Sequence, residues 1–233
     1  MSLLERVLEA AGADRWPAVR RFTSHLMLDG PLLAPLQGPY SFKEIVAEGD
    51  IASRSIRISG FSGAGAQWGF HPDFITIQHD DGAFVSARQP SAPRSFRGHK
   101  NEADLVYICG LSIWICLTGP LAMLSEGVQV EELGAWSEHG QNWSRLKVRA
   151  PEGALAYARE SVMYFSDDGL LRRTDFDLLC GEMIPIVVYS SAHQCFSCLT
   201  VPTLHRAVAY EAAEGAPQRT PLLDIEIFDA TFD

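Results

Sequence analysis

Residues 105–124, LVYICGLSIWICLTGPLAML, form a run of 20 residues without a charged side chain. This length approaches that of a membrane-spanning helix. The Gly119-Pro120 pair and the polar Thr118 interrupt the run, and the chain has no second segment of this kind. A helix that is apolar on every side must be surrounded by other parts of a folded protein. We therefore expect a buried core helix over residues 102–124 and no membrane span.

The rest of the chain is dominated by alternation of apolar and polar residues, which is typical of strands. Phe22, Leu26 and Leu28 fall on one face of the first such segment. Asp-Gly pairs at 81–82 and 168–169 are typical of hairpin turns. A short amphipathic helix is expected over residues 2–11. After the core helix, strands are predicted over residues 128–133, 142–150, 156–166, 170–178, 184–192, 200–209 and 222–231.

These elements predict an α+β fold with about 10–12 strands in one antiparallel sheet. A sheet of this size curls on itself, because curling reduces its exposed edges. We expect a strongly curved half-barrel or open barrel wrapped around the central apolar helix, with residues 1–233 forming a single domain. A barrel this wide is not filled by its own side chains, so it encloses a ligand cavity or needs a plug.

Charge and composition narrow the classes of partner. The chain has 19 Lys and Arg against 29 Asp and Glu, a net charge of −10, and its pI is about 5.1. This balance argues against nucleic-acid binding and against docking on an anionic membrane. The N-terminus carries Glu5 and Glu9 and has no long apolar segment, so we expect a cytoplasmic protein. The sequence leaves the oligomeric state open, with a homodimer as one expectation.

Cofactor and hydrolase motifs are missing from the sequence. It contains no GxGxxG, no GxxxxGK[ST], no GxSxG and no HExxH. We therefore expect no cofactor and a reaction, if there is one, that needs none. The nearest approach to a metal motif is His193, Cys195, Cys198 and His205. Zinc, a redox pair and ordinary packing thiols all remain open, but a lone CxxC with its thiols on opposite faces of a strand favours packing and no metal.

Three residues are the candidates for acid–base catalysis. Asp104 and Tyr107 lie three residues apart on the core helix and hence on one face. His193 follows an apolar strand, where its pKa can shift across neutrality. Each has a structural alternative: a charge at a helix N-terminus for Asp104, a core aromatic for Tyr107, and a hydrogen-bonded strand-end imidazole for His193. Further candidates are His99, in a predicted loop over residues 89–100, and Arg159, Glu160 and Asp175 in the strands that follow the core helix.

A second group of residues is predicted to contact the ligand. Trp114 lies seven residues after Tyr107, on the same helix face, where it can form one wall of a cavity. In the strand that begins at residue 157, alternation places Arg159, Ser161 and Met163 on one side and Glu160, Val162 and Tyr164 on the other. Either set can line the interior of the barrel, and the alternative for each is a solvated outer face. The residues expected to bind the substrate are Trp114, Trp68, Arg159, Met163 and Asp175.

Several motifs resemble a family of uncharacterised bacterial proteins. The segment YFSDDGLLRRTDFD at 164–177 resembles that family's DGLLRRxD hairpin, and His193, Phe196 and Pro202-Thr203 resemble its HxxF…PT strand pair. Two further segments resemble other parts of the same family. They are the block from Gly98-His99 to Pro120, which contains Asp104, Tyr107 and Trp114, and the early Arg15-Trp16 pair. The chain departs from the family pattern at Ala192, Cys195, Cys198, Leu204 and His205. The order of elements is also similar to that of curved-sheet carriers of lipids and lipoproteins.

The function expected from these features is the binding of a hydrophobic small molecule in a concave cavity. The first hypothesis is a cofactor-independent cyclase or isomerase of specialised metabolism, which folds an apolar, polyketide- or terpene-like chain into a reactive conformer. The alternative is a non-catalytic carrier of lipid-like ligands. A third hypothesis is a structural interaction module. The enzyme requires polar groups that converge inside the cavity, a carrier requires an apolar wall, and an interaction module requires an exposed apolar patch.

Overall fold

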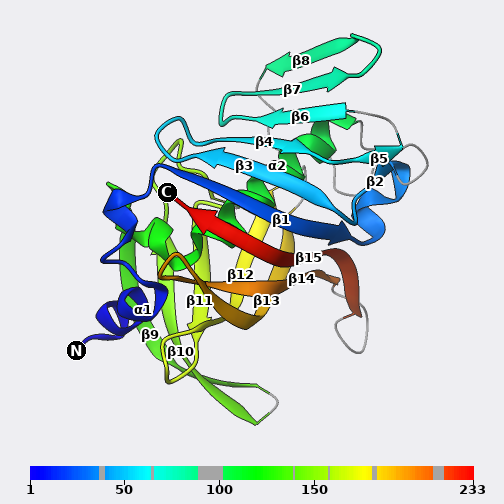
Figure 1. The fold of residues 1–233 in the computed structure, drawn as a ribbon. Helices are drawn as coiled ribbons and strands as arrows, with labels where there is room; N and C mark the ends of the chain where they lie inside the picture. Colours follow the sequence, from blue (N-terminus) through cyan, green and yellow to red (C-terminus); the bar gives the residue numbers. More distant parts are fainter. Residues whose placement is uncertain are drawn as a thin grey trace.

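The computed structural model of the protein describes residues 1–36, 40–63, 66–88, 102–138, 140–156, 158–179, 183–211 and 218–233. In these ranges thirteen strands form one antiparallel sheet that runs from β8 at one edge to β9 at the other (Figure 1). In spatial order the strands are β8 (Phe84–Arg88), β7 (Phe74–His79), β6 (Ala66–Phe70), β4 (Ser55–Ser59), β3 (Ile45–Asp50), β1 (Arg21–Asp29), β15 (Gln218–Phe232), β14 (Leu199–Glu211), β13 (Met183–Phe196), β12 (Leu171–Leu179), β11 (Glu160–Phe165), β10 (Gln141–Arg149) and β9 (Gln129–Glu138).

Two α-helices and several short elements complete the described chain. The first helix begins with a capping box, in which Ser2 accepts a hydrogen bond from the Glu5 amide and Glu5 accepts one from the Ser2 amide. The helical elements are α1 (Leu3–Ala11), η1 (Trp16–Ala18), η2 (Pro31–Leu36), α2 (Glu102–Thr118) and η3 (Gly119–Leu124), and a separate two-stranded sheet pairs β2 (Tyr40–Ser41) with β5 (Ser62–Gly63).

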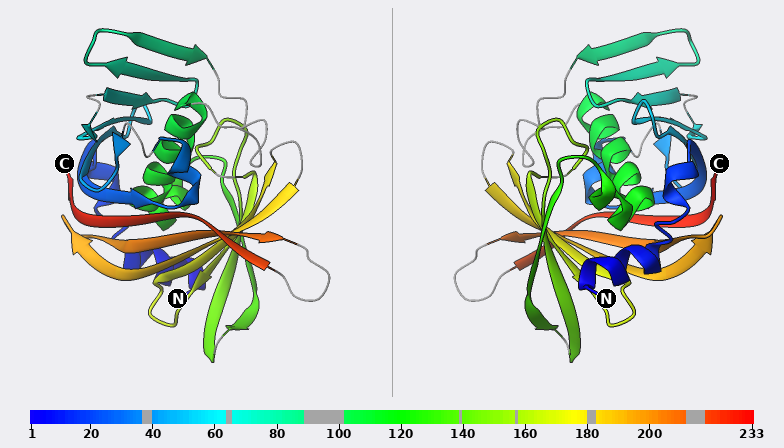
Figure 2. Two further views of the ribbon diagram at one scale, coloured as in Figure 1. Left: turned by 90° about the vertical axis from the view of Figure 1, so that its right-hand side faces the viewer. Right: turned by 90° about the vertical axis from the view of Figure 1, so that its left-hand side faces the viewer.

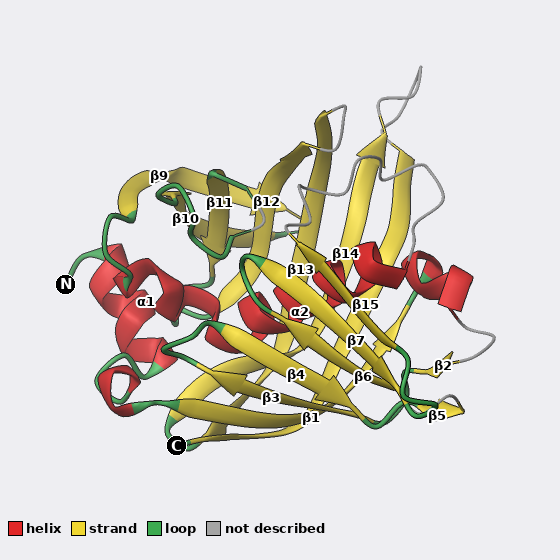
Figure 3. Ribbon diagram, turned by 90° about the horizontal axis from the view of Figure 1, so that it is seen from above, coloured by secondary structure: helices red, strands yellow, loops and turns green. Residues whose placement is uncertain are grey.

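The apolar helix α2 lies in the concave side of the sheet, between the N-terminal strands and β12–β14 (Figures 2 and 3). By length and composition, Glu102–Leu124 is apolar enough to cross a membrane, but 78% of its most apolar window is buried inside the protein. The enclosure follows from the sequence, because no face of this helix is polar enough to meet water.

Close contact between α2 and β6 depends on a glycine. A Cβ atom on Gly110 would lie 2.5 Å from the side chain of Phe70, so only glycine permits this approach. On the sheet side, the core positions facing the helix are large and fully buried, among them Ile58, Trp68 and Phe70. The helix axis is thereby held close to the N-terminal half of the sheet.

The C-terminal half of the sheet has two chemically different faces. Leu146, Met163, Thr174 and Val188 stand opposite one another on successive strands β10 to β13, on the concave face. The neighbouring row on the convex face is Arg145, Tyr164, Arg173, Tyr189 and Arg206, an alternation of arginine and tyrosine across five strands. The register therefore separates an apolar concave wall from a charged and aromatic outer face.

The predicted fold class is confirmed: a strongly curved antiparallel sheet surrounds a central apolar helix. The main sheet has thirteen strands in the described ranges, one more than the upper expectation. Register shifts between His25 and Leu26, and between Ala207 and Val208, mark bulges of the kind that bend and twist a sheet. The predicted loop at 89–100, which contains His99, lies outside the described residues.

Candidate functional site

A cavity of about 670 Å³ lies where α2 and η3 face the concave wall of the C-terminal strands. One side is formed by the C-terminal half of α2 and by η3, the other by β10, β11 and β12, and the segment at 150–156 closes one end. The lining residues include Trp16, Ile51, Arg54, Trp114, Ile115, Thr118, Met123, Glu126, Val148, Glu152, Leu155, Ser161, Met163 and Thr174.

The interior of this cavity is apolar. Trp114, Met123 and Val148 are each more than 90% buried, and the Trp114 ring packs on Phe22 with ring centroids 6.0 Å apart. The Thr118 hydroxyl is occupied, because it donates a hydrogen bond of 2.9 Å to the Trp114 carbonyl. A water-filled cavity needs several polar partners for each water, so a wall of this composition favours an apolar occupant.

The ionisable groups of the cavity lie at its rim. Arg54, Glu126 and Glu152 are exposed, and they are the charged side chains among its described lining residues. The Arg54 guanidinium donates a hydrogen bond of 3.1 Å to the Gly153 carbonyl, which joins the β3–β4 turn to the segment at 150–156. The rim therefore carries a formal charge of −1 around an apolar interior.

The structure places the predicted helix residues at different depths. Trp114 lines the cavity, whereas Tyr107 packs against Phe70, with ring centroids 5.5 Å apart, and is not in the described lining. Burial raises the pKa of the Tyr107 hydroxyl. Asp104 lies in the first turn of α2, at the end of the helix away from η3. Tyr107 and Trp114 share a helix face, as expected. Phe70 of β6 covers Tyr107, and the cavity begins further along the helix, at Trp114.

His193, the third acid–base candidate, lies on β13 immediately after Ala192, which has a positive φ of 54°. The pairing with β14 keeps its register on either side of Ala192, with Ser191 opposite Leu204 and His193 opposite Pro202. His193 is absent from the described lining of the cavity, and its Nε2 is buried without a hydrogen-bond partner among the described residues. Burial, and then the charge of Arg172, lowers the pKa of His193.

His205 is a structural histidine. It is 6% exposed, its Nδ1 lies 3.1 Å from the Ser190 hydroxyl, and its Nε2 lies 2.8 Å from the Pro202 carbonyl oxygen. A neutral ring satisfies both contacts when Nε2–H donates to Pro202 and Nδ1 accepts from Ser190. Burial lowers the pKa of His205 to about 4. Cys195 and Cys198 are exposed at the tip of the β13–β14 hairpin, and Cys198 lies in its turn rather than in a strand as expected.

The buried His205 predicts a loss of stability in mild acid. Its folded-state pKa of about 4 lies below the ordinary value of 6.5, so the unfolded chain binds more protons between these values. The contribution of the neutral His205 to stability is therefore fully present above pH 6.5 and decreases as the pH falls toward 4. From pH 7 to pH 5 we expect His205 to account for a loss of about 2 kcal/mol in unfolding free energy, measured by urea denaturation.

His205→Gln is expected to remove most of this dependence, because glutamine does not titrate in the range. His193→Gln serves as a comparison, since the lowered pKa of His193 gives a contribution of the same sign. An unchanged slope of stability against pH in His205→Gln would contradict the assignment.

The outer face of the C-terminal strands holds a buried charged cluster that the sequence pattern did not predict. The Arg173 guanidinium pairs with Glu138 and makes two hydrogen bonds to Asp175, of 2.6 and 2.8 Å. The Tyr164 hydroxyl donates to Asp175 at 2.7 Å, and the Tyr189 hydroxyl donates to Glu138 at 2.8 Å. Burial, reinforced by the Asp175 carboxylate, raises the pKa of Tyr164 to about 12.

Two predicted ligand-binding residues belong to this outer region. Arg159 and Asp175 line a depression of about 840 Å³ that also includes Arg173 and Tyr210. Asp175 is occupied by Arg173 and Tyr164. Glu160 forms ion pairs with Lys147 and Arg149 on the same face. Of the strand residues predicted to bind the substrate, Met163 alone lines the cavity beside α2.

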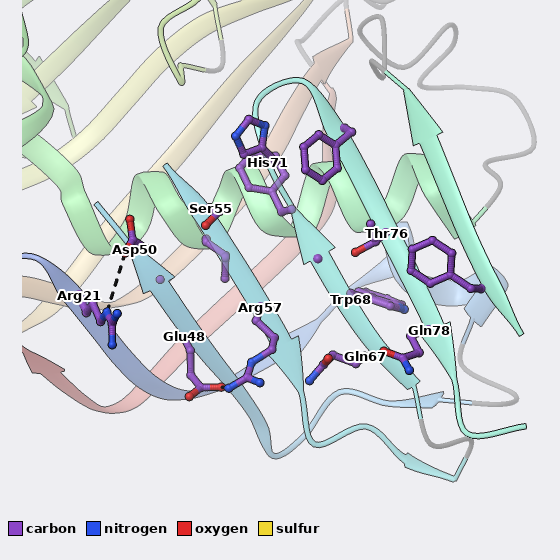
Figure 4. Close-up of a pocket in the computed structure, with 16 residues that line it drawn as sticks. Arg21, Glu48, Asp50, Ser55, Arg57, Gln67, Trp68, His71, Thr76 and Gln78 are labelled. Atoms are coloured by element: carbon purple, nitrogen blue, oxygen red, sulfur yellow. Dashed lines mark hydrogen bonds and ion pairs between the residues drawn. The ribbon is translucent and has the colours of Figure 1, made fainter. Parts of the chain in front are cut away.

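Trp68 is a core residue at the other end of α2. It is fully buried, its ring lies 4.4 Å from that of Phe61, and its Nε1 donates a hydrogen bond of 3.3 Å to Glu102. A depression of about 520 Å³ lies over its strand, on the face turned away from α2 (Figure 4). Polar side chains surround this depression, and its charges are paired across strands, Arg57 with Glu48 and Arg21 with Asp50.

Comparison with solved structures identifies the architecture. The chain superposes on a LolA superfamily protein from Nitrosomonas europaea over 100% of its own length and 94% of that chain, with a TM-score of 0.53 and 9% identity. The fold is LolA-like. A DUF1329 family protein from Desulfovibrio piger (TM-score 0.55, 10% identity, 99% of this chain and 92% of that one) is similarly related. So is an outer membrane lipoprotein-sorting domain from Vibrio parahaemolyticus (TM-score 0.53, 9% identity, 99% and 93%).

The predicted fold-level similarity to curved-sheet carriers of lipids and lipoproteins is therefore confirmed. No family model and no curated protein matches the chain. The resemblance of its hairpin and strand-pair motifs to a family of uncharacterised bacterial proteins stays a prediction. At 9–10% identity the superpositions describe the fold alone, so the function has to be argued from the cavity.

Proposed function

We propose that the protein binds one lipid-like molecule in the cavity between α2, η3 and the C-terminal strands, and carries it without chemical change. The observation behind this proposal is the cavity itself, with about 670 Å³ of space and an interior built from Trp114, Met123, Val148 and Met163. A volume of this size falls in the usual range for ligand sites, and the burial of an apolar chain there is favourable in proportion to its area.

The carrier hypothesis has more support than the cyclase or isomerase. An acid–base catalyst has to reach the reacting atoms of its substrate. The three candidates, Asp104, Tyr107 and His193, are not among the described lining residues, and the charged groups that are, such as Arg54, lie at the rim. The lipoprotein-sorting domain of Vibrio parahaemolyticus shares the fold, which adds an analogy to this argument.

Filling the cavity tests the proposal. Met163→Trp places a larger ring on the cavity wall, and we expect it to weaken binding of the neutral fluorescent probe N-phenyl-1-naphthylamine at least about tenfold, equivalent to about 1.4 kcal/mol. Val162→Trp is the matched control, because Val162 is the next residue on the same strand and points to the opposite face. We expect it to leave probe affinity unchanged.

Equal effects of the two substitutions, at matched folded fraction, would contradict the proposed site. Native mass spectrometry of the protein purified from its own host supplies the second measurement. A carrier retains an apolar ligand and releases it with its mass unchanged after incubation. A ligand that leaves with an altered covalent structure would instead favour the cyclase or isomerase.

A further inference from the structure

Two hydroxyl groups interrupt the apolar wall that β11 and β12 present to the cavity. Ser161 and Thr174 both line the cavity. Met163 stands directly opposite Thr174, and Ser161 is two residues before Met163 on the same strand. Ser161 and Thr174 are therefore diagonal neighbours on one face, close enough for a single ligand group to lie between them.

No hydrogen bond joins either hydroxyl to another described residue. Ser161 is half-buried and Thr174 is 8% exposed, and the Thr174 oxygen itself is not fully enclosed. The Thr118 hydroxyl, which also lines the cavity, is occupied, because it donates to the Trp114 carbonyl. When a ligand displaces solvent from such a hydroxyl, the hydroxyl needs a partner on the ligand, because buried polar groups in proteins are nearly always paired. The unpaired hydroxyls are consistent with a partner that a ligand supplies.

The charges around the cavity define what kind of partner this is. Among the described lining residues the single cation, Arg54, lies at the rim beside Glu126 and Glu152, and it is hydrogen-bonded to Gly153. A carboxylate at the depth of Thr174 would therefore be buried without a cation, which is costly. A neutral acceptor such as a carbonyl oxygen needs only the hydroxyl donors that the wall provides.

We propose that Ser161 and Thr174 donate hydrogen bonds to the carbonyl oxygen of a neutral acyl ester whose hydrocarbon chain lies against Trp114 and Met163. This inference rests on the proposed function and specifies its ligand class. The two hydroxyls select ester lipids over hydrocarbons, and the lack of a cation beside them among the described lining residues disfavours ionised fatty acids. Specificity arises because an analogue without the carbonyl leaves both donors unpaired.

The test compares an ester with its ether analogue, which lacks only the carbonyl group, and uses a fatty acid as a third ligand. Displacement of N-phenyl-1-naphthylamine by 1-oleoylglycerol, an ester, is measured beside displacement by 1-O-oleylglycerol, its ether analogue, and by oleate. We expect the unsubstituted protein to bind the ester about fivefold to tenfold more tightly than the ether, the scale of one or two net hydrogen bonds. Oleate is expected to bind more weakly than the ester at pH 8.

Thr174→Val preserves the shape of the side chain and removes its hydroxyl, and Ser161→Ala removes the other. The double substitution is expected to bring the ester-to-ether ratio to within about twofold, with ether affinity unchanged. Thr76→Val is the matched control, because Thr76 is a strand threonine on the opposite side of the sheet, in the outer depression. It should keep the full ratio. Thermal unfolding verifies that each variant is folded.

The outcomes separate this inference from the proposed function. If the unsubstituted protein binds the ester and the ether equally, or if the double variant keeps the full ratio, the ester assignment is overturned and the lipid site stands. Tighter binding of oleate than of the ester overturns the inference of a neutral ligand. If the folded protein binds none of the probes, the proposed function itself is overturned.

Discussion

Replacing Arg173 with methionine is expected to lower the free energy of unfolding by about 3–5 kcal/mol at pH 7, the usual cost of removing one partner from a buried ion pair. The side chains of Arg173 and Glu138 are each only 10% exposed, and that of Asp175 is 26% exposed. Without the guanidinium, Asp175 loses both of its hydrogen bonds from Arg173, and Glu138 keeps an ion pair of 3.7 Å with Arg219. Chemical denaturation measures the loss.

Two comparisons identify electrostatics as the cause. A triple variant, Arg173→Met with Glu138→Gln and Asp175→Asn, removes the two carboxylates that Arg173 had paired with and should recover most of the lost stability, since neutral replacements of buried charged groups are often tolerated. Arg173→Met alone should also gain stability relative to the unsubstituted protein as the pH is lowered from 7 to 5, because the carboxyl groups take up protons. A cost below about 1 kcal/mol would show that water screens the cluster.

Trp114→Ala is the second substitution with a large expected effect. Truncation of a buried tryptophan costs about 3–5 kcal/mol, and Trp114 is 6% exposed with its ring against Phe22. Because one side of the ring already faces the cavity, we expect a value at the lower end of this range. Trp136→Ala is the control, since Trp136 is 38% exposed and its loss should cost much less.

The same substitution is expected to weaken probe binding by about 1–3 kcal/mol when affinities are compared at matched folded fraction, the scale of one lost aromatic anchor. Trp114→Phe should keep part of both effects. If Trp114→Ala destabilises the protein and leaves probe affinity unchanged, the ring is a core residue alone, and the ligand lies elsewhere in the cavity.

Much of the architecture can be predicted from local sequence patterns. Alternation assigns Phe22, Leu26 and Leu28 to one face of their strand, and all three are buried. The uncharged run at 105–124 has no polar face, so its enclosure by the sheet is a physical necessity wherever the chain folds in water. The Asp-Gly pairs locate two hairpin turns because they accept the required backbone conformations.

The charged cluster on the outer face depends on how the strands pair. Alternation with a period of two says which face a residue occupies, but it does not say which residue of the next strand stands beside it. The pairing of Tyr164 with Arg173, and of Arg173 with Tyr189, follows from register between strands and gives no local signal. The same holds for Glu138, which lies far along the chain from Arg173.

The position of the cavity is likewise a property of the assembled fold. Local patterns are enough to establish that a curved sheet encloses an apolar helix, and that Tyr107 and Trp114 share a face of that helix. Only the packing of the whole chain shows that Phe70 covers Tyr107 while Trp114 is left open to a cavity. The assembled fold likewise leaves His193 outside the described lining. Helical and strand periods describe one element at a time, whereas a cavity forms where the curvature of a whole sheet keeps two elements apart.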